Sequence, residues 1–182
     1  RLWSDKDPDG GGPEGWLKHF PLLLPCHYFV HSTGSPCQYS AYIPSLLGGA
    51  EVLGRGYAHV EGNHGSSFPE GWVWSQGIGT DTDTSLSLVG GKFTIGAVSP
   101  LTWVVFFRKG GNTHVFRTTD MDHFSYDVDP ARNRIELTAT RTLHGSMPKT
   151  RMHLTIEATE GAVAAGADFG IHIHVPTIDG WS

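Results

Sequence analysis

Glycine and proline recur along the whole chain and divide it into short stretches. The 182 residues include 24 glycines and 11 prolines, more than a bundle of helices would tolerate. Between these breaks apolar and polar residues alternate, most clearly in segments 134–142 and 150–159. No stretch keeps the 3.6-residue period of a helix beyond a turn or two, outside an Ala- and Gly-rich piece at 160–167. The pattern predicts an all-β protein with little helix.

Short strands are expected at regular spacing, about eight to ten in all. Such spacing is typical of an antiparallel barrel or sandwich, and a barrel of about eight strands has room for one small ligand. We therefore expect a lead-in or linker over residues 1–15 and a single antiparallel lipocalin-like barrel or β-sandwich over 16–182. The glycine pairs Gly90-Gly91 and Gly110-Gly111 each predict a hairpin turn.

Two cysteines, Cys26 and Cys37, flank a segment that contains Thr33-Gly34. If the chain reverses at Thr33-Gly34, the two thiols face each other across a hairpin and could form a disulfide. Otherwise they are small buried apolar residues. Both alternatives stay open, because a disulfide depends on the redox compartment. No targeting segment is visible, which leaves the compartment unknown with the cytoplasm slightly favoured.

The charge and the motif content exclude several classes of function. A formal net charge of −5 gives no basic footprint for nucleic acid. No apolar run approaches the length of a membrane-spanning helix, and no phosphate-binding or dinucleotide-binding glycine loop is present. We expect no nucleic-acid partner, no membrane span and no cofactor.

Two smaller groups of polar residues are candidate sites. His172 and His174 have the spacing of two metal ligands on one strand, but a third ligand would have to come from elsewhere in the fold, so no metal is predicted. Asp120, Asp122 and His123 follow a strand closely. An Asp-His pair can serve as an acid–base unit, yet a solvated turn is the preferred interpretation for this cluster.

The stretch from Ala58 to Gln76 is unusually rich in polar and aromatic residues. In an alternating strand, one face would carry four hydrogen-bonding side chains, with glycines interrupting the run. Glycine within a strand often marks a bulge or the close approach of a ligand. A solvated sheet face would explain the same row, so a reaction site, a ligand wall and a structural corner all stay open. The row comprises Tyr57, His59, Glu61 and Asn63.

Two tryptophans continue this stretch. Trp72, Trp74 and Gln76 fall on one face of the next expected strand. As core residues the indoles would fill a barrel interior; as a ligand wall they would pack an apolar molecule or stabilise a cation over their rings. The two uses are compatible in a lined cavity.

The same stretch resembles a signature of the tocopherol cyclase family, which has an acid, an asparagine and a glycine, then Phe-Pro, then spaced tryptophans and a glutamine. The upstream residues Gly15-Trp16, Phe20-Pro21 and Pro25 are similar to the family's approach to this signature, so the likeness covers about residues 15–80. Gly62 stands where the family has lysine and His64 where it has tryptophan, so roles of that cation and indole are not carried over. The matching residues are Glu61, Asn63, Gly65, Phe68, Pro69, Trp72, Trp74 and Gln76.

The resemblance implies a function as well as a fold. The related lipocalin-like proteins, which include carotenoid hydratases and fungal Diels–Alderases, have two β domains, so this chain would be the C-terminal half, working with a separate or missing N-terminal β domain. It would be a cyclase or isomerase that closes a ring, with acid assistance or pericyclically, in a hydrophobic unsaturated small molecule such as a prenylated phenol, terpenoid or polyketide. The alternative function is a lipocalin-like carrier of such a ligand without catalysis.

The resemblance also implies roles for particular residues. Glu61 would be the acid, a carboxyl group held in an apolar pocket. Asn63 and His64 would orient Glu61 or donate a hydrogen bond to a substrate oxygen. The substrate would be bound by a second group of side chains, with no metal and no cofactor. That group comprises Tyr57, His59, Phe68, Trp72, Trp74 and Gln76.

Overall fold

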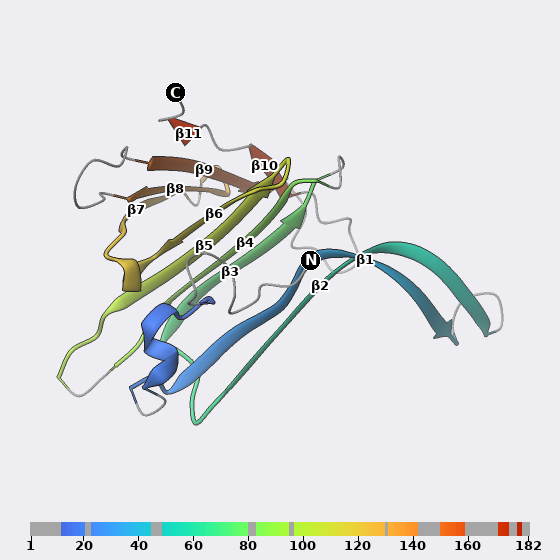
Figure 1. Cartoon of the computed structure of the whole chain (residues 1–182), viewed down its shortest axis with the longest axis horizontal. Helices are drawn as coiled ribbons and strands as arrows, with labels where there is room; N and C mark the ends of the chain where they lie inside the picture. The colour runs from blue at the N-terminus through green and yellow to red at the C-terminus, as the bar shows by residue number, and fades with distance from the viewer. Residues whose placement is uncertain are drawn as a thin grey trace. The chain divides into compact units, whose positions relative to one another are not determined.

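The computed structural model describes residues 12–20, 23–44, 49–79, 83–94, 97–129, 131–141 and 150–158, and the backbone of 171–174 and 178–179. Its regular structure is almost entirely strand, with two short 3-10 helices, η1 (Gly15–His19) and η2 (Thr118–Asp120). Figure 1 shows the strands arranged in separate sheets. The prediction of an all-β, antiparallel protein is confirmed.

The chain divides into two compact units, Arg1–Val115 and Phe116–Ser182. The first contains β1 (Cys26–Ile43), β2 (Ala50–Gly65), β3 (Gly71–Ile78), β4 (Ser85–Lys92) and β5 (Leu101–Lys109). Strand β6 (Asn112–Arg117) spans the division. The second contains β7 (His123–Asp129), β8 (Arg134–Arg141), β9 (Thr150–Ala158), β10 (Ile171–His174) and β11 (Ile178–Asp179). A single domain over 16–182, as one half of a longer protein, stays a prediction.

Three sheets account for all these strands. β1 pairs with β2, β3 to β6 form a sheet in sequence order, and β10-β9-β8-β7 form the third, in which β11 also pairs with β9. Among the described strands the sheets stay open and no closed barrel forms. The hairpin predicted at Gly110-Gly111 is confirmed between β5 and β6, where both glycines have positive φ, 56° and 87°.

The hairpin expected at Thr33-Gly34 is wrong. β1 runs without reversal from Cys26 to Ile43, and its pairing with β2 shifts register between Val30 and Ser35. Gly34 has a φ of +61°, a conformation that L side chains rarely adopt. Gly34 therefore forms part of a β-bulge and not of a turn that reverses the chain. A bulge adds residues to one strand and increases its twist.

The two cysteines consequently lie on the same strand. Both are free thiols, and their partners across the ladder are Gly65 for Cys26 and Gly56 for Cys37. Their partners on β2 lie nine positions apart, a distance of roughly 30 Å at about 3.3 Å per residue. The disulfide alternative is therefore excluded in this structure.

The hairpin expected at Gly90-Gly91 is also wrong, because both residues lie inside β4. Gly90 pairs directly with Trp103 of β5, and a Cβ at Gly90 would collide with the Trp103 ring. The same arrangement recurs in the β1–β2 ladder, where Phe29 lies over Gly62. These glycines leave room for an aromatic ring from the neighbouring strand, a use that sequence alone does not distinguish from a turn.

The core of the first unit lies between β1 and one face of the β3–β4–β5 sheet. Four buried residues, Val30, Val104, Phe106 and Val115, form a cluster against which Tyr28 and Val89 pack. The registers place three sets of paired residues on this face, which we call the inner face, and these sets include Val89, Val104 and Phe106. These sets are Trp74, Val89 and Val104; Gln76, Ser87 and Phe106; and Ile78, Ser85 and Arg108.

The core of the second unit follows the alternation seen in the sequence. Leu137 and Ala139 of β8 pair with Leu154 and Met152 of β9, and all four are buried. The pairing of segments 134–142 and 150–159 is confirmed, because each strand needs its apolar side chains on the same face.

Candidate functional site

Three polar side chains from β1 and β2 meet at one carboxylate oxygen. The hydroxyl group of Tyr28 donates a hydrogen bond to Glu61 Oε2 at 2.5 Å, and His59 Nε2 lies 2.7 Å from the same oxygen. His59 and Glu61 are two residues apart on β2 and therefore share a face. The His59 side chain is buried and that of Glu61 is 21 % exposed. The groups form a hydrogen-bonded cluster largely removed from solvent.

Tyr28 connects this cluster to the β3–β4 strands. Its hydroxyl oxygen lies 3.4 Å from Ser87 Oγ. Burial raises the pKa of Tyr28 far above its ordinary value of 10.0, and the hydrogen bond to Glu61 raises it further. The contacts with Ser87 and Trp74 act in the opposite direction and are outweighed. Tyr28 therefore stays protonated and acts as a hydrogen-bond donor.

Glu61 is anchored through one of its two oxygens. Both hydrogen bonds reach Oε2, and within the described residues Oε1 has no hydrogen-bond partner. A carboxyl group held in this way can present its second oxygen to a ligand and exchange a proton there. His59 supplies an imidazole, a common partner of a carboxylate in proton transfer, at the anchored oxygen.

The exposure pattern of β2 reverses beside the bulge in β1. Up to Tyr57 the odd-numbered residues of β2 are exposed, whereas beyond it Val60 is exposed and His59 and Glu61 point inward. A bulge in the partner strand increases the local twist and re-aims the side chains that follow. Tyr57, predicted on the same face as His59 and Glu61, consequently stays at the surface.

Asn63 and His64, predicted to orient Glu61, are exposed at the end of β2. Glu61 takes its hydrogen bonds from Tyr28 and His59 instead. The role that the resemblance implied for Asn63 and His64 stays a prediction. Of the two residues that contact Glu61, only His59 was among the expected site residues.

His64 belongs to a second aromatic and polar group on the other face of the β1–β2 ladder. Its ring stacks on His27 with 5.3 Å between centroids and lies 5.8 Å from the ring of Phe29. Glu14 Oε2 lies 2.9 Å from His27 Nδ1, and Glu14 Oε1 accepts the backbone N–H of Tyr28 at 2.6 Å. Glu14 falls in the expected lead-in, so the end of that segment is fastened to β1.

Trp72, Trp74 and Gln76 share the inner face, as predicted. β3 is the edge strand of its sheet, and all three side chains are exposed, Trp72 at 62 % and Trp74 at 42 %. Trp74 also acts to lower the pKa of Tyr28, against the larger effects that raise it. The buried cluster therefore lies close to an exposed aromatic row.

Phe68 and Pro69 form part of the connection between β2 and β3. Phe68 is exposed, and Pro69 packs over Gly91, where an added Cβ would lie 3.1 Å from the Pro69 ring. Pro69 therefore holds this connection against β4, and Phe68 is outside the Glu61 cluster.

The sequence did not indicate two members of the cluster. Tyr28 lies 33 residues before Glu61, and Ser87 lies 59 residues after Tyr28. Both are in segments predicted as strands, but no spacing rule relates strands so far apart. A polar residue flanked by apolar ones, as Ser87 is by Leu86 and Leu88, was the one available signal.

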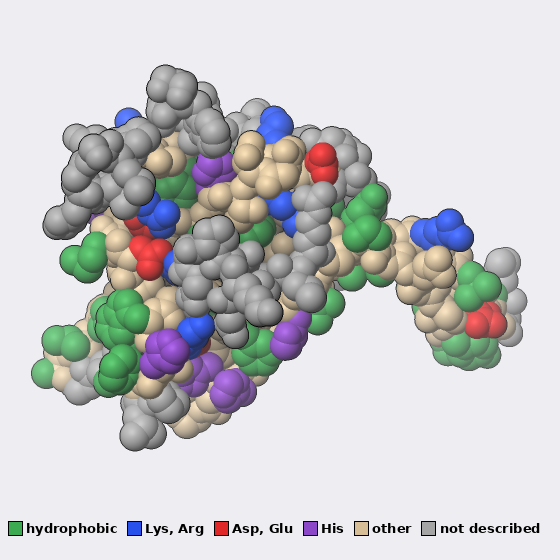
Figure 2. All heavy atoms as spheres, in the orientation of Figure 1, with side chains coloured by type: hydrophobic (Ala, Val, Ile, Leu, Met, Phe, Trp, Pro, Cys, Tyr) green, Lys and Arg blue, Asp and Glu red, His purple; other side chains and the backbone are tan. Residues whose placement is uncertain are grey.

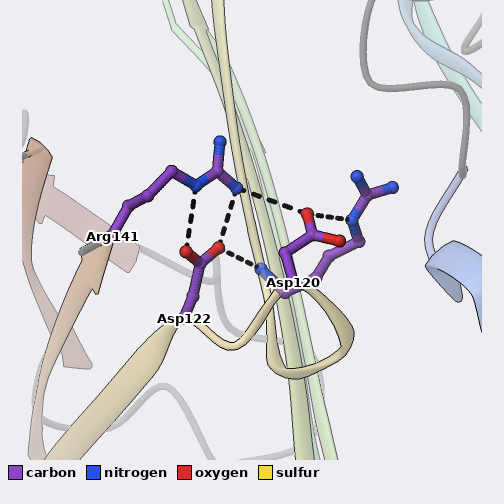
Figure 3. Close-up of polar contacts among 4 residues, drawn as sticks. Asp120, Asp122 and Arg141 are labelled. Carbon is purple, nitrogen blue, oxygen red and sulfur yellow. Dashed lines mark hydrogen bonds and ion pairs between the residues drawn. The ribbon is translucent and has the colours of Figure 1, made fainter. Parts of the chain in front are cut away.

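Asp120 and Asp122 belong to an ionic clamp in the second unit, which Figure 3 shows. Asp122 accepts two hydrogen bonds from Arg141, from Nε at 2.9 Å and Nη2 at 2.8 Å, and one from the backbone N–H of Arg117 at 2.8 Å. Asp120 Oδ2 accepts from Arg117 Nε at 2.8 Å. The Asp122 side chain is 1 % exposed, so the interpretation of a solvated turn is wrong for Asp122. The two hydrogen bonds from Arg141, at the end of β8, hold the segment that follows η2 in place, which is a structural role.

The described part of the chain contains neither a group of metal ligands nor a membrane-spanning helix. No group of three or more His, Cys, Asp or Glu side chains there could hold a metal ion. The side chains of His172 and His174 lie outside the described residues. No helix among the described segments is long and apolar enough to cross a membrane.

Tyr28 is expected to make the protein less stable at alkaline pH. Because its pKa in the folded protein lies above the unfolded value of 10.0, the unfolded chain loses this proton first. The stabilisation that protonated Tyr28 gives the folded protein is complete below pH 10. It is lost as the pH rises from there toward the pKa that Tyr28 has in the folded protein. Urea unfolding should show the wild-type free energy falling above pH 10, at up to about 1.4 kcal/mol per pH unit more steeply than in Tyr28→Phe. Tyr39→Phe, an exposed control, should follow the wild type; equal slopes for wild type and Tyr28→Phe would contradict the burial of this hydroxyl.

Comparison with known proteins gave no match: no family model, no curated protein and no solved structure corresponds to this chain.

Proposed function

We propose that this protein is a cyclase or isomerase that uses Glu61 as an acid–base group on a hydrophobic, unsaturated small molecule. One observation carries the proposal: Glu61 is anchored through Oε2 by Tyr28 and His59, while Oε1 has no partner among the described residues. The Glu61 side chain is 21 % exposed, so Oε1 can face solvent or a ligand while Oε2 is held by the protein.

The inner face supplies a surface suited to an apolar ligand. Trp72 and Trp74 expose large aromatic surfaces there, and Gln76 adds an amide that can donate to a carbonyl or hydroxyl oxygen. An exposed pair of tryptophans on an edge strand otherwise leaves apolar area in water, which soluble proteins generally avoid outside binding sites. The ligand class therefore combines an apolar body with few polar groups.

Ring closure by this route is an isomerisation and leaves the proton count unchanged. Glu61 Oε1 would give a proton to one carbon of an alkene, the ring bond would form, and a proton would return to Oε1 from the product cation. His59, at Oε2, would balance the charge on the carboxyl group during these steps, and Tyr28 would keep its own proton. Trp74 would stabilise the transient cation over its ring. In a pericyclic closure no proton moves, and the same groups hold the two reacting ends together.

Ligand capture tests the binding half of the proposal. Native mass spectrometry of the protein from its source should reveal a bound small molecule, and extraction should identify a cyclised polyene, prenylated phenol or polyketide. Added cis-parinaric acid, an apolar fluorescent polyene, should bind and quench tryptophan emission. Trp72→Ala and Trp74→Ala should each weaken this binding by about tenfold, through lost apolar contact.

The control for this experiment is Trp16→Ala, which removes an exposed tryptophan of η1 and should leave binding unchanged. Failure of the protein to take up parinaric acid, or equal binding by all three variants, would argue against a ligand surface on the inner face. The Glu61 cluster would then be a structural corner between the β1–β2 ladder and β4.

A further inference from the structure

No third strand among those described pairs with the outer part of the β1–β2 ladder. We call Pro36–Ile43 of β1 together with Ala50–Tyr57 of β2 the outer ribbon; they pair with each other and with no other strand among those described. Leu53 is 74 % exposed there and Tyr42 68 %. In Figure 2 this end of the ladder displays hydrophobic, basic and acidic side chains together. A two-stranded ribbon with exposed apolar side chains is marginally stable alone in water, which favours a partner strand.

The two edges of the outer ribbon differ in sequence. On β1, Pro36 has no N–H to donate, and the bulge between Val30 and Ser35 interrupts the ladder. On β2, the run from Ala50 to Tyr57 keeps an uninterrupted register and contains neither proline nor lysine. Strand edges without such protection are templates for another strand. Cys37–Ile43 of β1 keeps the same uninterrupted register, so both edges can accept a strand, and it is the charges of β2 that distinguish its edge from that of β1.

The charged side chains of β2 are complementary to those of a second, antiparallel copy of β2. Its exposed side chains alternate along one face: Glu51, Leu53, Arg55 and Tyr57. Glu51 and Arg55 stand at equal distances on either side of Leu53. Arg55 makes no ion pair within the described part of the chain, and Glu51 Oε1 accepts a hydrogen bond from Ser40 at 2.7 Å. An antiparallel copy of β2, paired about a two-fold axis at Leu53, would set each Glu51 opposite an Arg55.

We propose that the protein forms a two-fold symmetric dimer in which the β2 edges of two outer ribbons pair antiparallel about Leu53. The two Leu53 side chains meet at the axis, and a Glu51–Arg55 pair flanks them on each side. This contact joins two ribbons into a four-stranded sheet and is independent of the Glu61 cluster. A copy of the same chain fits because the order of charges fixes both the direction and the register of pairing.

Charge reversal tests the register directly. Sedimentation equilibrium should show a concentration-dependent dimer for the wild type. Glu51→Arg and Arg55→Glu should each raise the dissociation constant by about tenfold or more, because each creates two like-charge pairs. A mixture of the two variants should form a heterodimer, in which every cross-strand pair again has opposite charges. The double variant with both reversals should dimerise like the wild type.

Arg132→Glu, the same charge change at an exposed turn between β7 and β8, is the control and should dimerise normally. The heterodimer also guards against misfolding, since a variant that fails to fold could not be rescued by mixing. A monomer at all concentrations would overturn the proposal. So would a dimer whose dissociation constant is unchanged by the two single reversals, because its contact would lie elsewhere.

Discussion

Replacing Glu61 by glutamine is expected to lower turnover by about 10²- to 10⁴-fold while leaving ligand binding nearly unchanged. Glutamine keeps the shape of the side chain and an oxygen that can accept from Tyr28, but it cannot exchange a proton at the position of Oε1. The measurement is conversion of the compound recovered with the protein, followed by chromatography, beside binding of parinaric acid to the same variant.

The matched control is Glu70→Gln, the same substitution at an exposed carboxylate that begins the approach to β3. It should convert the compound at the wild-type rate. Three outcomes for Glu61→Gln separate the candidate functions. Lost turnover with intact binding supports acid–base chemistry. Unchanged turnover indicates a pericyclic reaction that needs no proton, and binding without any turnover in the wild type indicates a carrier.

The second large effect concerns the stability of the unit that contains the ionic clamp. Asp122→Ala should lower the free energy of unfolding by about 2–4 kcal/mol, because it removes a buried carboxylate that accepts charge-assisted hydrogen bonds. Arg141 Nη2 keeps one partner, Asp120 Oδ2 at 3.4 Å. Arg141 would lose both hydrogen bonds of its fork, and the backbone N–H of Arg117 would lose its acceptor. Urea unfolding followed by circular dichroism measures the change.

Arg132→Ala provides the comparison. It breaks the ion pair with Asp129, but Arg132 is 76 % exposed, and surface pairs contribute about 1 kcal/mol or less. An effect of Asp122→Ala no larger than that of Arg132→Ala would mean that the clamp does not fasten η2 to β8. Asp122→Asn should fall between the two, because an amide oxygen still accepts a hydrogen bond but carries no charge.

Local patterns predicted the features that depend on near neighbours in the sequence. Alternation in 134–142 and 150–159 identified β8 and β9, since each apolar side chain there must reach the same core. Gly110-Gly111 identified a tight turn, because two consecutive positive φ values suit glycine. The shared face of Trp72, Trp74 and Gln76 likewise follows from the period of a strand.

The predictions that were wrong concern residues whose structure depends on partners far away in the sequence. Gly34 and Gly90 look like turn residues, yet one serves a bulge and the other makes room for Trp103. The bulge also determines which side chains of β2 face inward. Simple alternation does not include this effect, and it therefore placed Tyr57 on the same face as His59 and Glu61. The sequence did not predict Tyr28 as a site residue, because only the pairing of β1 with β2 brings it beside Glu61.

The aromatic rings that lie over glycines also constrain how the sequence can diverge. At Gly90 any larger residue would need Trp103 to shrink or turn away, and a smaller residue at 103 would leave an apolar void. The same holds for Gly62 with Phe29. The effects of substitutions at the two members of each pair are therefore expected to depend on each other.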